Sequence, residues 1–132
     1  MTTIAIIGSR TFTDQVLLTE TVDRFITRNK LTDITIVSGG AKGADRIGAE
    51  YAQYHGYKLV VHKADWKDLT QPGVRIKSNR YGQYNANAGH YRNTLIINDA
   101  DVVIAFTNGS PGTADSIRKA QKAGKPVTVV SF

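Results

Sequence analysis

The sequence contains no cysteine, which excludes disulfide bridges, thiolate metal sites and a cysteine nucleophile. It also has no apolar run close to the roughly 20 residues that a membrane-spanning helix needs. Its first residues, Met1 to Ile4, include no basic side chain of the kind that opens a secretory signal. These absences predict a cytoplasmic protein that makes no membrane contact.

Acidic residues are scarcer than basic ones. The chain has 17 Lys and Arg against 11 Asp and Glu, so its formal net charge is +6 over 132 residues. A positive protein attracts anionic ligands. The basic residues are scattered and their densest patch, Arg75 to Arg80, is short. A small anionic metabolite therefore explains the charge at least as well as nucleic acid, which stays open as an alternative partner.

Short apolar segments alternate with helical patterns along the chain. The predicted strands are Thr3–Ile7, Ile34–Val37, Tyr57–His62, Asp101–Phe106 and Pro126–Val130. The predicted helices are Val16–Asn29, with Thr13 or Asp14 as its cap, Ala44–His55, Tyr91–Ile97, which ends near Asn98, and Ala114–Ala123. This alternation predicts one α/β domain over residues 1–132, with a Rossmann-like, doubly wound parallel sheet of five strands in the order 3-2-1-4-5.

Residues 63–89 interrupt the alternation and have little periodicity. A connection this long inside a small domain is usually a functional lid or a disordered segment. Trp66, Tyr81, Tyr84 and the nearby Tyr91 give it enough aromatic surface to pack, so we expect a long ordered loop.

Three glycine-rich turns follow predicted strands: Gly8–Arg10, Ser38–Asp45 and Gly109–Thr113. A strand, a glycine turn and a helix start together make an anion site, because the first helical amides lack partners. Any one turn could equally be a connection that binds nothing. In the predicted strand order, however, all three lie at one edge of the sheet, near the point where the order reverses, and this convergence favours a ligand site.

The turns offer groups suited to a phosphorylated ligand. Amides and hydroxyls would hold phosphate, and Arg10 and Arg92 would neutralise it. Asp45 or Asp115 would contact ribose, although each can equally be an acid favoured by a helix dipole. Trp66 or a tyrosine would stack on the base. The candidate ligand-binding residues are Gly8, Ser9, Arg10, Ser38, Gly39, Gly40, Lys42, Gly43, Asp45, Trp66, Arg92, Asn93, Gly109, Ser110, Gly112 and Thr113.

Several common sites are missing. No turn has the GxxxxGK[ST] or GxGxxG spacing of ordinary ATPases and NAD dehydrogenases. His55, His62 and His90 do not have metal-ligand spacing. We therefore predict no metal and no cofactor.

Five ordered motifs resemble the YspA/YpsA-related branch of the SLOG superfamily. They are Gly8-Ser9-Arg10-x-Phe12-x-Asp14, Ser38-Gly39-Gly40-Ala41-x-Gly43-Ala44-Asp45, Ala64-Asp65-Trp66, Ala88-Gly89-x-x-Arg92-Asn93 and Gly109-Ser110-x-Gly112-Thr113. The resemblance implies a Rossmann-like domain that binds a nucleotide-derived signal of the ADP-ribose or cyclic-nucleotide type, as a sensor or, in a phage, as a sequestering protein.

The same resemblance extends more distantly to the LOG phosphoribohydrolases and to the DprA core. LOG enzymes use an acid after a PGGxGT motif to cleave an N-glycosidic bond, and here Asp115, with Arg92, would take the catalytic roles. Ser110 replaces the second glycine and an aspartate is one methylene shorter than a glutamate, so binding is better supported than hydrolysis. Nucleic-acid binding of the DprA kind is a third hypothesis for the function. Related domains pair through helices beside the cleft, which implies a homodimer or a higher homo-oligomer.

Overall fold

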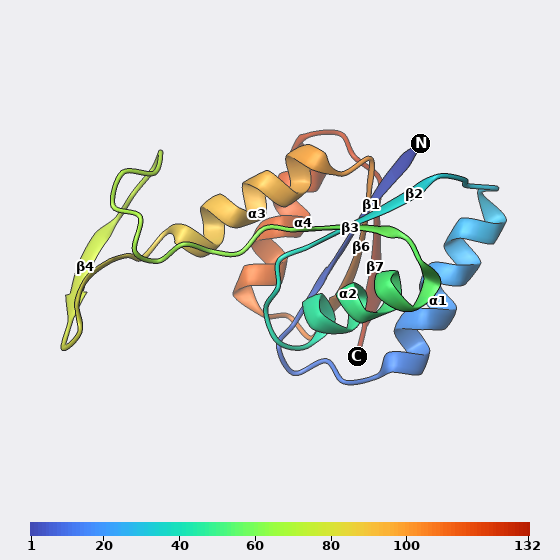
Figure 1. Ribbon diagram of the computed structural model, residues 1–132, viewed down its shortest axis with the longest axis horizontal. Helices are drawn as coiled ribbons and strands as arrows, with labels where there is room; N and C mark the ends of the chain where they lie inside the picture. The colour runs from blue at the N-terminus through green and yellow to red at the C-terminus, as the bar shows by residue number, and fades with distance from the viewer.

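Five parallel strands form the centre of the computed structural model, which describes residues 1–132 (Figure 1). The strands of this sheet are β1 (Thr2–Gly8), β2 (Ile34–Ser38), β3 (Lys58–Val61), β6 (Val102–Thr107) and β7 (Val127–Ser131). Their order is β3-β2-β1-β6-β7, so the predicted order 3-2-1-4-5 of the sheet strands is confirmed. The winding reverses between β1 and β6, where Ile4 pairs with Val102 and Gly8 with Phe106.

Four helices cover the two faces of this sheet: α1 (Gln15–Arg28), α2 (Ala44–His55), α3 (Ala88–Asp99) and α4 (Pro111–Lys122). Helices α1 and α2 pack on one face, and α3 and α4 pack on the other (Figure 1). None of the four is long and apolar enough to cross a membrane.

The side chains of β1 explain why its sequence is a continuous apolar run. Ile4 and Ile6 point into the core under α1 and α2, whereas Ala5 and Ile7 point into the core under α3 and α4. Successive strand residues face opposite sides, so a strand covered on both faces needs apolar residues at every position.

Two helices begin three residues earlier than predicted, and this difference shapes the site. Helix α3 starts at Ala88 instead of Tyr91, and α4 starts at Pro111 instead of Ala114. Proline suits the first helical position because it lacks an N–H and its φ is already helical. Gly112 therefore lies in the first turn of a helix instead of in a loop.

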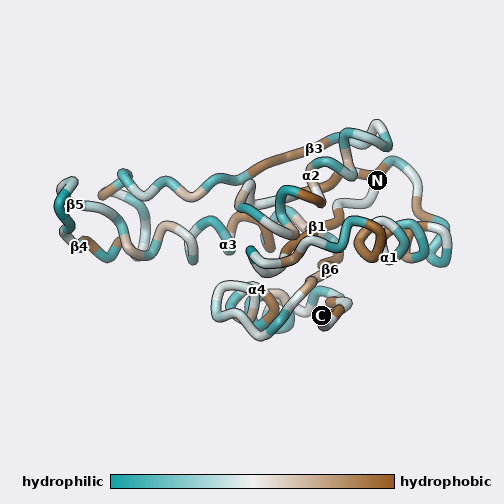
Figure 2. Tube along the Cα trace, turned by 90° about the horizontal axis from the view of Figure 1, so that it is seen from below, coloured by the Kyte–Doolittle hydropathy of each residue, from teal (hydrophilic) through white to brown (hydrophobic).

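The segment 63–89 contains a β-hairpin that the sequence analysis did not predict. Strands β4 (Ile76–Asn79) and β5 (Gly82–Asn85) pair only with each other and form an arm that projects from the body (Figures 1 and 2). All four residues of β4 are exposed, so the apolar alternation that usually identifies a strand is missing. Asn85 anchors the arm at its root, since its buried side chain accepts from the amides of Arg75 and Asn87.

Candidate functional site

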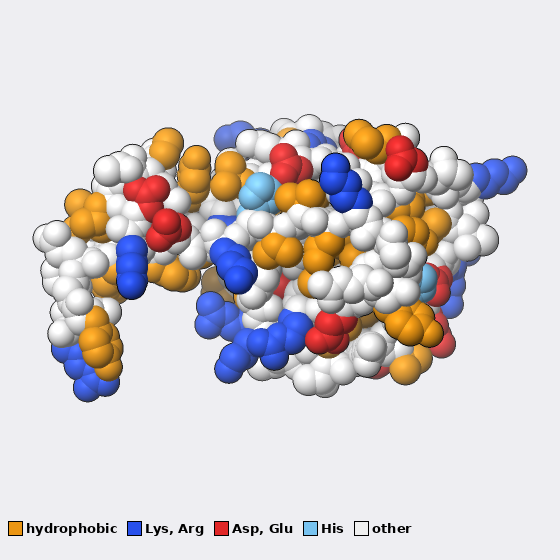
Figure 3. Space-filling view, viewed as in Figure 1, with side chains coloured by type: hydrophobic (Ala, Val, Ile, Leu, Met, Phe, Trp, Pro, Cys, Tyr) orange, Lys and Arg blue, Asp and Glu red, His pale blue; other side chains and the backbone are white.

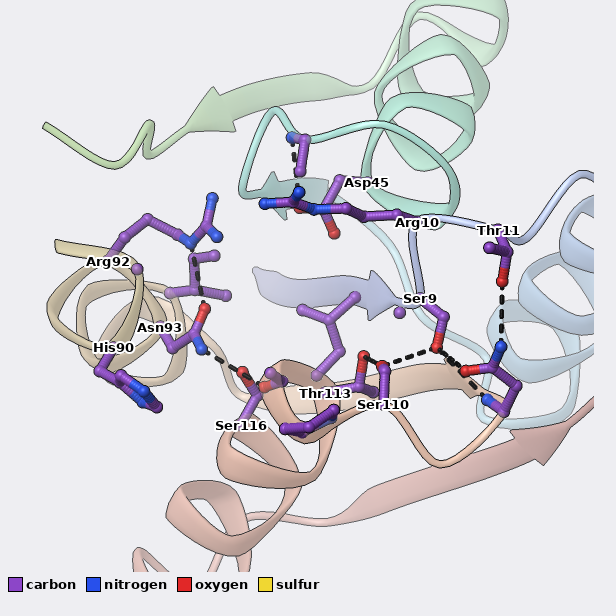
Figure 4. A pocket seen from close by; sticks show the side chains of 18 of the residues that line it. Ser9, Arg10, Thr11, Asp45, His90, Arg92, Asn93, Ser110, Thr113 and Ser116 are labelled. Carbon is purple, nitrogen blue, oxygen red and sulfur yellow. Dashed lines mark hydrogen bonds between the residues drawn. The ribbon is translucent and has the colours of Figure 1, made fainter. Parts of the chain in front are cut away.

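A cleft of about 430 Å³ opens at the carboxyl ends of β1 and β6, where the strand order reverses (Figure 4). We call it the main cleft. The volume is within the range of small-molecule sites. Its wall includes ten of the predicted ligand-binding residues: Gly8, Ser9, Arg10, Asp45, Trp66, Arg92, Asn93, Ser110, Gly112 and Thr113.

Main-chain contacts fix two of the turns against each other. The carbonyl oxygen of Ser9 accepts from the amides of Phe12 and Ala44, at 3.2 and 3.3 Å, and the Ser9 amide donates to Phe106 O at 2.9 Å. Gly43 has a φ of 80°, and a Cβ on it would lie 2.3 Å from Ser9 O. Only glycine permits this approach, so the turns after β1 and β2 form one rigid unit.

A chain of hydroxyl groups links the turn after β1 to the start of α4. Ser9 Oγ donates to Asn108 Oδ1 at 2.8 Å and lies 2.8 Å from Ser110 Oγ, which donates to Thr113 Oγ1 at 3.0 Å (Figure 4). Ser9 and Thr113 are buried. The hydroxyls are therefore fixed in place before any ligand arrives.

Three helices begin at the main cleft, and none of them has a side-chain cap. Gly43 has no side chain to cap α2, Asn87 donates to Gly73 O instead of capping α3, and the Ser110 hydroxyl bonds to other hydroxyls instead of capping α4. By contrast, the predicted cap of α1 is present, because Asp14 accepts from the Leu17 amide at 2.9 Å. The open ends of α3 and α4 leave first-turn amides free to bind an anion.

Asp45 and Arg92 both lie against Gly39 in the turn after β2. Arg92 Nη1 donates to Gly39 O at 2.7 Å, and a Cβ on Gly39 would lie 2.7 Å from that nitrogen and 2.6 Å from Asp45 Oδ2. Burial raises the pKa of Asp45 to about 6, although Arg92, the Ala41 amide and Arg10 all favour its charged form. Burial likewise lowers the pKa of Arg92. The cleft thus holds an acid that titrates near neutral pH.

Asp115 lies beside the main cleft and does not line it. Its carboxylate accepts from Lys119 at 2.6 Å and from Asn93 at 3.3 Å, and lies 3.2 Å from His90 Nδ1. Burial alone would raise the pKa of Asp115, but the hydrogen bonds from Lys119, His90 and Asn93 hold it below its usual value. The carboxylate therefore reaches the cleft only through His90 and Asn93, which do line it.

One aromatic side chain lines the main cleft. Trp66 packs close to Gly89 at the start of α3, where a Cβ would lie 3.4 Å from its ring. Tyr84 and Tyr91 are not in the wall, and Tyr81 is at the turn of the arm with 83% of its surface exposed. Of the aromatic residues considered for stacking, Trp66 is the one at the cleft.

The other predicted residues lie around the main cleft. Gly39, Gly40 and Lys42 line a second hollow next to it. Gly43, Gly109 and Asp115 line neither hollow, and neither does Ser38, whose buried hydroxyl donates to Asp45 O at 2.8 Å. No group of three His, Asp or Glu side chains gathers as a metal ion would require.

Sequence reasoning missed four polar residues of the main cleft: Thr11, His90, Asn108 and Ser116. Thr11 and Asn108 adjoin predicted glycine turns, and this adjacency was a usable signal. No local pattern identifies His90 as a cleft residue, and Ser116 lies on α4 one residue beyond Asp115.

Comparison with known proteins places the chain in a family. A model of the YspA, cpYpsA-related SLOG family matches residues 2–68. The Gene 61 protein of Mycobacterium phage D29 is 31% identical over 134 residues, covering 96% of this chain and 94% of that protein.

Solved structures of DNA processing protein A have a similar fold. The Helicobacter pylori protein is 28% identical with a TM-score of 0.68, over 97% of this chain and 64% of that one. The Streptococcus pneumoniae protein is 22% identical with a TM-score of 0.70, over 98% of this chain and 50% of that one. The chain thus spans about half to two thirds of these proteins. The family model and the phage relative agree with the glycine motifs, and the chain belongs to the YspA, cpYpsA-related SLOG family.

Proposed function

We propose that this protein binds a phosphorylated, nucleotide-derived small molecule in the main cleft, of the ADP-ribose or cyclic-nucleotide type. The observation that carries the proposal is the meeting of uncapped helix starts, fixed hydroxyls and two arginines at one cleft. Free amides at helix starts favour an anion, and an arginine adds charge-assisted hydrogen bonds to phosphate oxygens.

The cleft offers a position for each part of such a ligand. The Gly112 and Thr113 amides and the Ser110 hydroxyl would hold phosphate at the start of α4. Arg10 and Arg92 would neutralise its charge from the opposite wall. The Asp45 carboxylate lines the same cleft and would accept a hydrogen bond from a ribose hydroxyl.

Calorimetric titration with AMP, ADP-ribose and a cyclic dinucleotide tests the proposal. We expect saturable binding of at least one of them at sub-millimolar concentration. Arg10 makes no ion pair within the chain, so Arg10→Ala should weaken binding roughly ten- to hundredfold, the effect of losing a hydrogen bond to a charged group. Arg24→Ala, on the exposed side of α1, is the matched control. The proposal is wrong if none of the three ligands binds.

The salt dependence of binding separates this proposal from binding to a nucleic acid. The Helicobacter pylori relative is described as a single-stranded DNA binder. If this chain instead bound a nucleic-acid strand, affinity would fall steeply with salt, because many counterions are released. A mononucleotide-sized ligand should give a shallow slope.

The contact between His90 and Asp115 favours one enzymatic alternative, a nucleotide N-glycosidase. Asp115 holds His90 Nδ1, so the other ring nitrogen is available for proton transfer at the cleft. Incubation with nucleoside 5′-monophosphates and NAD derivatives, followed by detection of released base, separates turnover from binding. Asp115→Ala should abolish turnover in an enzyme and leave part of the binding in a binding module.

The phage relative suggests a use for binding without turnover. In a phage, a protein that held a signalling nucleotide without cleaving it would withdraw that signal from the host. In a cell, the same binding would serve a sensor. We also propose a homodimer or higher homo-oligomer that pairs through the helices beside the cleft, and a monomer mass by light scattering would contradict this.

A further inference from the structure

A second hollow of about 390 Å³ adjoins the main cleft. The two share Arg10, Ala41, Trp66 and Arg92 in their walls, so they are continuous. The second hollow is formed by the turn after β2, by the first turn of α2 and by the chain that follows β3. We call it the basic hollow.

Five cationic side chains line the basic hollow, and no acidic side chain does. They are Arg10, Lys42, Arg46, Lys63 and Arg92. None of the five forms an ion pair within the chain, whereas Arg118 and Lys119 do pair with Asp115. Lys and Arg side chains gather at the edge of the body that faces the arm, as Figure 3 shows. Asp45 lies near Arg92 and Arg10 and offsets part of their charge. Lys42, Arg46 and Lys63 have no acidic side chain beside them in the wall of the hollow, and an anion bound there would reduce the repulsion among them.

Arg46 and Lys63 bring positive charge to the basic hollow from two different parts of the fold. Arg46 lies in the first turn of α2, where the helix dipole disfavours a cation. Lys63 packs over the turn at Gly40, whose Cβ would lie 3.3 Å from Lys63 Cγ. Arg46 and Lys63 line the same hollow as Lys42, and a bound anion would offset the repulsion among the three charges.

We infer that the basic hollow is a second phosphate subsite, so the ligand of this protein is a nucleotide that carries two phosphate groups. The inference rests on the proposed function, because the first phosphate and its nucleoside occupy the main cleft. Trp66 lines both hollows, and a base or ribose between the two phosphates would lie against its ring. Pyrophosphate-linked and phosphodiester-linked nucleotides share this chemistry.

Three probes distinguish the subsites and the two kinds of linkage: AMP, ADP-ribose and 5′-phosphorylated diadenylate. AMP and ADP-ribose carry similar net charge at neutral pH, so a difference between them reports the second phosphate position and not total charge. Trp66 is the only tryptophan, and its fluorescence reports on both hollows. We expect at least one two-phosphate probe to bind ten times more tightly than AMP.

The double variant Arg46→Ala/Lys63→Ala tests the residues. The ratio of two-phosphate affinity to AMP affinity should fall to within twofold of one. Arg24→Ala/Arg28→Ala, on the exposed side of α1, removes the same charge away from both hollows and should keep the wild-type ratio. If AMP binds as tightly as both other probes, or if the double variant keeps the wild-type ratio, the second subsite is refuted while the proposed function stands. If neither these probes nor a cyclic dinucleotide binds, both are refuted.

Discussion

Asp45 gives the fold a stability cost that one substitution should remove. Burial raises its pKa from an ordinary 3.8 to about 6, so above pH 6 the folded state holds a charge that it solvates poorly. The difference of about two pKa units, at about 1.4 kcal/mol each, is worth roughly 3 kcal/mol. Asp45→Asn keeps the shape and an oxygen for the Ala41 amide while removing the charge. The variant should therefore be more stable than the wild type at pH 7.5 by up to about 3 kcal/mol.

The sign of the pH dependence follows from the raised pKa. Between pH 4 and 6 the folded state binds more protons than the unfolded state. The contribution of protonated Asp45 to the free energy of unfolding is therefore complete below pH 3.8 and is lost as the pH rises through about 6. Urea unfolding of both proteins from pH 4 to 8 measures this as a difference in free energy that grows with pH. Glu20→Gln, an exposed acid on α1, controls for net charge. A difference that stays constant with pH, or a variant less stable at pH 8, would refute the reasoning.

Three further outcomes are expected. Gly48→Ala should destabilise the fold by about 1–2 kcal/mol in urea unfolding, because its Cβ would lie 2.7 Å from buried Ile6 Cγ2 and this crowding outweighs the helix preference for alanine. Gly112→Ala has open space around the new Cβ and should not destabilise the fold. Equal effects of the two substitutions would contradict this reasoning. Asn85→Ala removes the hydrogen bonds that its side chain accepts from the amides of Arg75 and Asn87, at about 0.5–1.5 kcal/mol each. Tryptic cleavage of the arm should therefore accelerate at least about tenfold, and unchanged protection would disprove the anchoring role of Asn85. Binding of ADP-ribose should take up a proton near pH 6–7, since a bound anion favours protonated Asp45. Calorimetry in buffers of different ionisation enthalpy measures this proton uptake, and equal binding heats in all buffers would exclude it.

The fold was predictable because its signals are local and repeated. Every strand of the main sheet is short and apolar, and the helices between them have clear ends such as Gly56, which caps α2 in a left-handed conformation. Right-handed crossovers then leave few sheet orders. The arm was not predictable, because β4 packs on nothing and its residues follow no burial pattern.

The candidate site was predictable in position and less so in detail. The sequence does not distinguish a serine in a glycine turn whose hydroxyl faces a ligand from one whose hydroxyl bonds within the protein. The Ser38 hydroxyl donates to the main chain of the protein, whereas Ser110 lines the cleft. The predicted start of α4 is three residues too late, because the segment Gly109–Thr113 has the composition of a glycine-rich turn. Proline at the first helical position is nevertheless a known start signal. His90 depends on a contact with Asp115 that is 25 residues away in sequence, and no local pattern reports it.

The interlocked turns behind the cleft limit how this protein can change its preference. Ser9 O and the glycine that approaches it present peptide groups, which are the same whatever the neighbouring side chains. Substitution of Gly43 can therefore distort the site but offers no new side chain that would change its ligand selectivity. New ligand selectivity would arise more readily at side chains on α3 and the segment before the arm, such as Trp66, His90 and Asn93, which line the cleft. A library for altered recognition is therefore best confined to α3 and the segment before the arm, with the glycine turns held constant.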